Sequence, residues 1–106
     1  MASIFTQCCY NRYMEEKITR KRIIFTGYVQ GVGFRYRAYY AATSAGVTGW
    51  VENQDDGSVI LEIQGTQSQI DEVVMMIERG TFIQVMDMKV KTLSVDEEER
   101  EFTVLY

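Results

Sequence analysis

The run GYVQGVGFR, from Gly27 to Arg35, combines residue types that suit phosphate binding. Gly31 and Gly33 can adopt backbone angles that other residues avoid, and they have no side chain to obstruct an anion. Successive backbone N–H groups can therefore converge on one phosphate. Arg35 follows with a planar, permanently charged guanidinium group that matches phosphate oxygens. The run predicts a phosphate-binding loop between a strand and a helix.

This loop does not match the common nucleotide-binding patterns. A dinucleotide site would have a third glycine two residues after Phe34, where Tyr36 stands, and a nucleotide P-loop would have lysine followed by serine or threonine. What remains is a predicted helix N-terminus with unpaired N–H groups beside Arg35. A cation at the positive end of a helix costs stability unless an anion lies between them. The position of Arg35 therefore favours phosphate binding over a surface ion pair or a loop without a ligand.

A second run, GWVENQDDGSV from Gly49 to Val59, contains a neutral amide that can take part in chemistry. The side chain of Asn53 donates and accepts hydrogen bonds, so it can hold a water molecule. Asparagine is also common where a chain turns, and Asp55, Asp56 and Gly57 follow closely. The residues alone leave both interpretations open.

Together the two runs resemble the acylphosphatase family. The family pattern is a glycine, a variable residue and VQGVGFR, followed further along by a glycine, an aromatic residue, an apolar residue, any residue, Asn, and then DG before a strand. The departures are Tyr28, where a basic residue is common, and Gly80-Thr81, where Gly-Pro is usual. The resemblance covers residues 22–106, and its matching positions are Gly27, Val29 to Arg35, Gly49, Trp50, Val51, Asn53 and Asp56-Gly57.

The resemblance implies hydrolysis of the carboxyl-phosphate bond of acyl phosphates to a carboxylate and inorganic phosphate. It assigns phosphoryl binding to Arg35 and positioning of the attacking water to Asn53, and these are the two expected catalytic residues. The alternative is a non-catalytic accessory module that binds phosphate or carboxylate. The expected phosphate-binding residues are Gln30, Gly31, Val32, Gly33, Phe34 and Arg35.

The composition narrows the classes of function. A chain of 106 residues with 46% hydrophobic residues is expected to form one small globular domain. Its net charge of −4 argues against a nucleic-acid interface or an anionic membrane surface as partner, and it also counts against RNA recognition by a βαββαβ sheet. The chain has no histidine, which excludes serine-histidine and cysteine-histidine nucleophile pairs and removes the commonest metal ligand. We expect a monomer that uses neither a metal nor a cofactor.

The two cysteines, Cys8 and Cys9, are adjacent and lie outside the patterned region. They predict neither a disulfide framework nor a zinc site, and a reduced, cytoplasmic setting fits them best. No apolar run approaches the ~20 residues of a membrane span, and the first residues lack the basic start and long apolar middle of a signal peptide. The expected location is therefore the cytoplasm.

Hydrophobic periodicity predicts the elements that position the candidate site. The order βαββαβ with an added short strand predicts an α+β fold, a ferredoxin-like two-layer sandwich with two helices on one face of an antiparallel sheet. The predicted strands are 23–30, 47–52, 58–64, 82–93 and 102–106. The first predicted helix starts at Phe34 and ends near Gly46, and the second lies between a candidate cap at Ser68 and Gly80.

The remaining expectations concern the N-terminus and the aromatic residues. Residues 1–20 show no steady period, and we interpret them as a flexible tail or a start-site extension, with a short docking arm as the alternative. Residues 21–106 form the predicted acylphosphatase-like domain. Tyr36, Tyr39 and Tyr40 are expected to pack over the sheet with their hydroxyl groups outward. Trp50 is expected in the core with its indole N–H at the rim.

Overall fold

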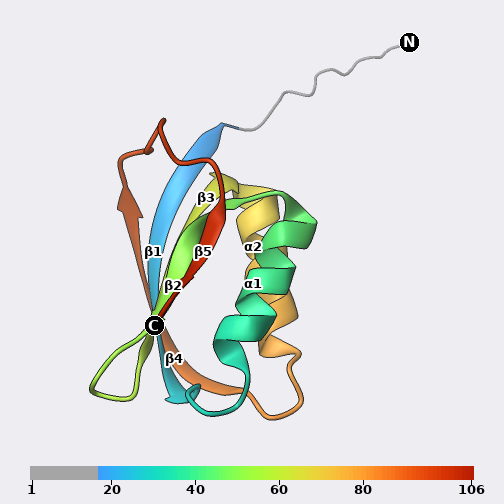
Figure 1. The fold of residues 1–106 in the computed structure, drawn as a ribbon, viewed down its shortest axis with the longest axis vertical. Helices are drawn as coiled ribbons and strands as arrows, with labels where there is room; N and C mark the ends of the chain where they lie inside the picture. The colour runs from blue at the N-terminus through green and yellow to red at the C-terminus, as the bar shows by residue number, and fades with distance from the viewer. Residues whose placement is uncertain (1–16) are drawn as a thin grey trace.

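The computed structural model describes residues 17–106, and residues 1–16 lie outside the described part of the chain (Figure 1). The adjacent cysteines Cys8 and Cys9 and most of the expected N-terminal tail lie in that undescribed part. The described elements are β1 (Ile18–Tyr28), α1 (Phe34–Ala45), β2 (Thr48–Asn53), β3 (Val59–Thr66), α2 (Gln67–Glu78), β4 (Gln84–Leu93) and β5 (Phe102–Leu105). Neither helix of residues 17–106 has the length and apolar character needed to cross a membrane.

The five strands form one sheet in the order β4-β1-β3-β2-β5, and both helices lie on the same face of it (Figure 1). The predicted α+β two-layer architecture is therefore confirmed. The core lies between the helices and the sheet and is built from fully buried side chains of both layers. Its largest members are Phe25, Phe34, Leu61, Ile63, Ile70 and Ile77.

The sheet is mixed, not antiparallel throughout as the sequence predicts. β1 pairs antiparallel with β3 and β4, and β2 pairs antiparallel with β3, but β5 pairs parallel with β2. The loop 94–101 leaves the end of β4 at one edge and crosses one end of the sheet to the opposite edge (Figure 1). The chain then runs back opposite to β4, which makes β5 parallel to β2.

The predictions for the helix ends are partly confirmed. Gly46 ends α1 with a φ of +79°, as the glycine predicts. The cap of α2 is Thr66 and not Ser68, because Thr66 and Gln69 form a reciprocal capping box in which each side chain bonds the other residue's backbone N–H. Arg79, not Gly80, caps the C-terminal end of α2.

The predicted boundary between tail and domain at residue 20 is too late. β1 begins at Ile18, and residues Ile18 to Arg20 pair with Thr66 to Gln64 of β3. The alternation of strand residues is hard to recognise here because Arg20 is a charged residue whose side chain is buried, with 5% of its surface exposed. The folded unit therefore includes residues 18–20.

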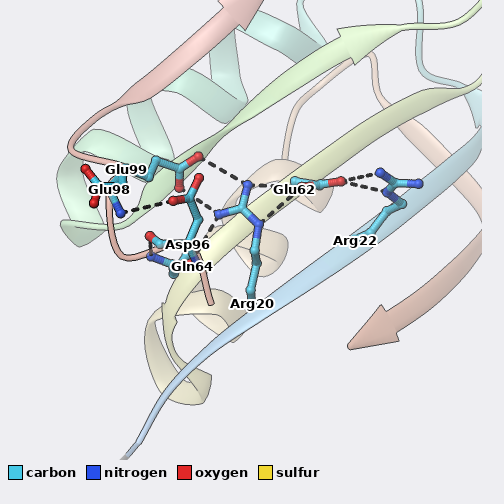
Figure 2. Close-up of polar contacts among 7 residues, drawn as sticks. All are labelled: Arg20, Arg22, Glu62, Gln64, Asp96, Glu98 and Glu99. Carbon is cyan, nitrogen blue, oxygen red and sulfur yellow. Dashed lines mark hydrogen bonds and ion pairs between the residues drawn. The ribbon is translucent and has the colours of Figure 1, made fainter. Parts of the chain in front are cut away.

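Arg20 belongs to a buried network of ion pairs (Figure 2). The network lies on the sheet face that carries no helix. Arg20 pairs with Glu62 of β3 at 3.0 Å and with Glu99 of the loop 94–101 at 2.8 Å. The hydrogen bond to Glu99 is the largest cause that raises the pKa of Arg20. Arg22 pairs with the other oxygen of Glu62, and Gln64 bonds the backbone of Asp96.

The network attaches the loop 94–101 to the central strands, and the loop leads directly into β5. Trp50, predicted to lie in the core, lies instead half-buried in β2 opposite Glu62, at a position that alternates with buried Val51. Pairing with β2 and the ion pair that anchors the preceding loop thus hold β5 in place.

Arg20→Met is expected to lower the free energy of unfolding by about 3 kcal/mol, because it leaves two largely buried carboxylates without their shared cation. Urea denaturation measures the change. Lys21→Met is the matched control, since Lys21 is only partly buried and its side chain bonds Thr92 rather than a carboxylate. Equal losses of stability in both variants would contradict a special role for the network.

Candidate active site

The loop between β1 and α1 is fastened where it leaves β1. Val29 is fully buried, and the side chain of Gln30 donates hydrogen bonds to the carbonyl oxygens of Gln54 at 2.7 Å and Ser58 at 2.8 Å. The amide of Gln30, predicted among the phosphate-binding residues, is therefore engaged with the turn between β2 and β3. Any phosphate contact by Gln30 has to use its backbone.

The two loop glycines leave an open approach to the start of α1. Gly31 and Gly33 have φ values of +72° and +82°, which favour glycine, and a Cβ atom added at either would meet nothing within 4 Å. Gly33 is the N-cap of α1, and it makes no side-chain hydrogen bond to the first turn. The first N–H groups of a helix have no partner within the helix, so they are available to an anion at this end.

Arg35 follows in the first turn of α1 and is held by the end of β5. Its Nη1 donates to the carbonyl oxygen of Leu105 at 3.2 Å, and its guanidinium carbon lies 4.9 Å from the centre of the Tyr106 ring. No carboxylate of residues 17–106 forms an ion pair with it. The alternative of a surface ion pair therefore has no support, and the guanidinium keeps N–H groups for a ligand.

Asn53 is the last residue of β2, and its side-chain oxygen Oδ1 is buried without a hydrogen-bond partner. A buried unpaired acceptor costs about 1–3 kcal/mol, so such atoms are unusual in a fold that has no use for them. The final torsion of an asparagine has a broad range, so its amide group can adopt several orientations. No side chain within residues 17–106 competes with a water molecule for the amide oxygen of Asn53.

The turn after β2 forms without help from the Asn53 side chain. Gln54 N–H donates to the carbonyl of Ser58 at 2.8 Å, and Gly57 N–H donates to the carbonyl of Gln54 at 3.1 Å. Asp56 accepts hydrogen bonds from the hydroxyl and backbone N–H of Ser58, and these bonds lower the pKa of Asp56. The turn-forming interpretation of Asn53 is therefore weakened, because its neighbours supply the hydrogen bonds.

The glycine loop, Arg35 and Asn53 all line one cavity of about 590 Å³. It is lined by Gly31, Gly33 and Phe34 of the loop and helix start, by Arg35, and by Asn53. The structure therefore brings both predicted catalytic residues to one space, although they are separated along the chain. Of the predicted phosphate-binding residues, Gln30 and Val32 do not line it.

The cavity is also lined by residues that the sequence analysis did not assign to the site. Tyr36 and Tyr39 lie on one wall, and the opposite wall comes from residues 101–104 and Tyr106 around β5. Tyr36 and Tyr40 do not pack over the sheet as predicted, whereas the ring of Tyr39 lies against Phe102 of the edge strand β5. The three tyrosines are exposed to 68%, 38% and 53%, in the order Tyr36, Tyr39, Tyr40, and their rings pack edge to face on one another.

The reason is that small residues occupy the buried face of α1. Ala38, Ala41 and Ala42 are buried against the sheet, and the tyrosines fall on the other side of the helix. The alanine spacing was visible in the sequence and could have identified the tyrosine face as exposed. The hydroxyl groups of Tyr36 and Tyr40 lie 3.1 Å apart, and this hydrogen bond raises the pKa of Tyr40.

No group of three or more histidine, cysteine, aspartate or glutamate side chains within residues 17–106 is arranged to hold a metal ion. At the end of the cavity beside the glycine loop, the available groups are a cation, a set of backbone N–H groups and one amide. These groups can bind an anion with tetrahedral oxygens and hold a water molecule near it.

Comparisons with known proteins agree with this arrangement. The acylphosphatase family model matches residues 21–104. An acylphosphatase from Oceanobacillus iheyensis is 48% identical over 82 residues, which are 76% of this chain and 90% of that protein. A crystal structure of acylphosphatase from Bacillus subtilis superposes with a TM-score of 0.77 at 35% identity, covering 83% of this chain and 99% of that one.

The same fold occurs inside a much longer protein. A full-length HypF in a phosphate- and nucleotide-bound form matches 90% of this chain with a TM-score of 0.77, but only 13% of HypF is covered and the identity is 24%. That likeness concerns the fold alone. The family model matches most of this chain, and relatives of similar length share up to 48% identity with it. This chain therefore belongs to the acylphosphatase family.

Proposed function

We propose that this protein hydrolyses the bond between the carboxyl and phosphoryl groups of acyl phosphates, releasing a carboxylate and inorganic phosphate. The observation that carries the proposal is the shared cavity, where the glycine loop, Arg35 and Asn53 meet. Family membership supports the same reaction.

In the proposed mechanism the phosphoryl group lies at the N-terminus of α1. Backbone N–H groups from Gly31 to Arg35 and the guanidinium of Arg35 bind its oxygens, and the positive end of the helix dipole adds to their attraction. Leu105 and Tyr106 hold the guanidinium in place, so that fewer side-chain conformations are lost when the substrate binds. Charge that develops on the phosphoryl oxygens meets donors that are already oriented.

The attacking water is held by the amide of Asn53, on the side of the phosphorus away from the leaving carboxylate. The water oxygen forms the new P–O bond, the bond to the carboxylate oxygen breaks with its electron pair on that oxygen, and a phosphoryl oxygen takes the proton of the water. Phosphoryl transfer depends mainly on position and charge stabilisation. A histidine or another protein base is therefore not required.

Turnover of benzoyl phosphate by the purified protein without added metal tests this proposal. The expected result is steady release of phosphate at a rate that EDTA does not change, because every proposed contact is made by protein groups. Loss of activity with EDTA that magnesium or zinc restores would contradict the mechanism. Binding of phosphate without any turnover would favour the alternative of a non-catalytic binding module.

The cytoplasmic location and the monomeric state expected from the sequence remain predictions. Sedimentation of the purified chain over a range of concentrations tests the second.

A further inference from the structure

We propose that the ion pair between Arg20 and Glu99 positions Arg35 for phosphate binding, although neither Arg20 nor Glu99 lines the cavity. The connection runs through the loop 94–101 and β5, which ends beside the guanidinium of Arg35. Arg20 and Glu99 are then positioning residues of the phosphate site. The proposal rests on the proposed function, because it takes Arg35 to bind the phosphoryl group of the substrate.

β5 is a short edge strand with little packing of its own. It has four residues, pairs only with β2 within residues 17–106, and buries only Phe102. Its C-terminal end supplies the carbonyl oxygen of Leu105, which accepts a hydrogen bond from Arg35 at 3.2 Å, and Tyr106 follows with its ring against the guanidinium. A displacement of β5 therefore displaces both groups that hold the guanidinium.

The loop that leads into β5 has no hydrophobic anchor. Val95 is the single apolar residue of the loop 94–101, and 40% of its surface is exposed. Glu99 is the single residue of this loop that is not exposed, and its side chain keeps 14% of its surface accessible. Burial of apolar surface therefore contributes little to fixing the loop. Polar contacts with the central strands determine where it lies.

Hydrogen bonds attach both ends of the loop to the sheet. Near its start, the backbone of Asp96 exchanges two hydrogen bonds with the side chain of Gln64 of β3, at 2.8 and 3.0 Å (Figure 2). At its end, the backbone N–H of Gly49 of β2 donates to the carbonyl oxygen of Glu101 at 3.2 Å. These bonds are made by uncharged groups, so each contributes modestly.

The contact between Arg20 and Glu99 is charged and two-pronged (Figure 2). Nη1 and Nη2 of Arg20 donate to the two carboxylate oxygens of Glu99 at 2.8 and 3.2 Å. The other N–H groups of Arg20 donate to Glu62 and Gln64, so all five guanidinium donors have a partner. Such a pair fixes orientation as well as distance, and it is about twice as strong as a neutral hydrogen bond. Glu99 precedes Phe102 by only three residues, so the place of its carboxylate limits the place of β5.

Glu99→Gln tests the proposal with little change in shape. It removes the charge and directs an amide NH₂ group toward guanidinium donors, so the two-pronged contact is lost. We expect the Kd for inorganic phosphate to rise by about 3- to 10-fold, and kcat/KM for benzoyl phosphate to fall by a similar factor. Glu97→Gln is the matched control, because it removes the same charge from an exposed position of the same loop that forms no ion pair within residues 17–106.

A purely structural role of Glu99 predicts a different pattern. Loss of stability alone lowers the folded fraction and leaves the Kd of the folded protein unchanged. Val73→Ala should produce that pattern, because Val73 is fully buried in α2 and does not line the cavity. Urea denaturation measures the stability of both variants. If Glu99→Gln binds phosphate as tightly as Val73→Ala does, Glu99 has no positioning role.

The route through Arg35 is tested by combining Glu99→Gln with Arg35→Lys. Lysine lacks the planar group that contacts Leu105 and Tyr106 together, so the position of β5 has less influence on the cation. The effect of Glu99→Gln on kcat/KM should then shrink to less than about twofold, because residues that act through one contact are not additive. An undiminished effect in the Arg35→Lys protein would overturn the assigned route.

The outcomes separate this proposal from the proposed function. If the unmodified protein binds phosphate but does not hydrolyse benzoyl phosphate, the proposed function fails, and the phosphate titrations of Glu99→Gln and Glu97→Gln still decide the positioning role. If benzoyl phosphate is hydrolysed and the two variants have the same Kd for phosphate, hydrolysis stands and the positioning role is overturned. If the unmodified protein neither binds phosphate nor hydrolyses benzoyl phosphate, both proposals are overturned.

Discussion

Asn53→Ala is expected to lower kcat by about 10²–10³-fold while phosphate affinity stays within a few-fold of the unmodified protein. In the proposed mechanism Asn53 contacts the attacking water and not the phosphoryl group. Its loss therefore raises the barrier of the chemical step without removing a contact to the bound phosphate. Benzoyl phosphate kinetics measure the first effect, and titration with inorganic phosphate measures the second.

Gln54→Ala is the matched control for this experiment. Gln54 is the next residue, also carries an amide, and does not line the cavity that holds Arg35. Its side chain bonds Glu52, so the substitution should leave kcat nearly unchanged. A contrary result would be an Asn53→Ala protein with normal kcat and lower stability, because Asn53 would then serve only the turn between β2 and β3.

Asn53→Ala also carries information about stability. Its Oδ1 atom is buried and unpaired, so removing it relieves a cost instead of breaking a hydrogen bond within the protein. We therefore expect the free energy of unfolding to fall little. An active-site residue that contributes to the rate and not to stability fits the proposal that its partner is a water molecule in the cavity.

Arg35→Lys is expected to lower kcat/KM by about 10²–10³-fold and to weaken phosphate binding at the same time. Lysine keeps the positive charge, but it is a point charge that cannot present two parallel N–H groups to the phosphoryl oxygens. It also lacks the planar group that lies over the Tyr106 ring and bonds the Leu105 carbonyl. The combined loss in binding and rate distinguishes Arg35 from Asn53.

Arg37→Lys provides the comparison for this substitution. Arg37 is two residues further along α1, is exposed, and bonds the carbonyl of Met76 outside the cavity. Activity and phosphate affinity should both be close to those of the unmodified protein. An Arg35→Lys protein that binds phosphate normally would remove the guanidinium from the proposed phosphate site.

Features that depend on neighbouring residues could be predicted from the sequence. The positions of Gly31 and Gly33 require left-handed backbone angles, which glycine adopts most readily, and α1 starts directly after them. The alternation in the central strands and the helical spacing in α1 and α2 are similarly local, so the two-layer fold could be predicted as well. Arg35 and Asn53 are part of these local runs.

The sequence-based predictions fail for features that depend on residues far apart along the chain. The buried Arg20 conceals the start of β1, because the groups that compensate for its burial, the carboxylates of Glu62 and Glu99 and the amide of Gln64, lie far along the chain. Thr66 was overlooked as the cap of α2 because it is also the last residue of β3. The exposed tyrosines of α1 were misplaced because large aromatic residues usually pack in the core.

The glycine loop, the arginine at the start of α1 and the asparagine at the end of β2 follow from local runs of residues. Their position around one cavity, and the other residues that enclose it, follow from long-range contacts. The course of the loop 94–101 across the end of the sheet makes β5 parallel to β2, and this brings Leu105 to Arg35 and residues 101–104 to one wall of the cavity. No pattern of neighbouring residues encodes that course, because it results from ion pairs and strand pairing between residues that are remote along the chain.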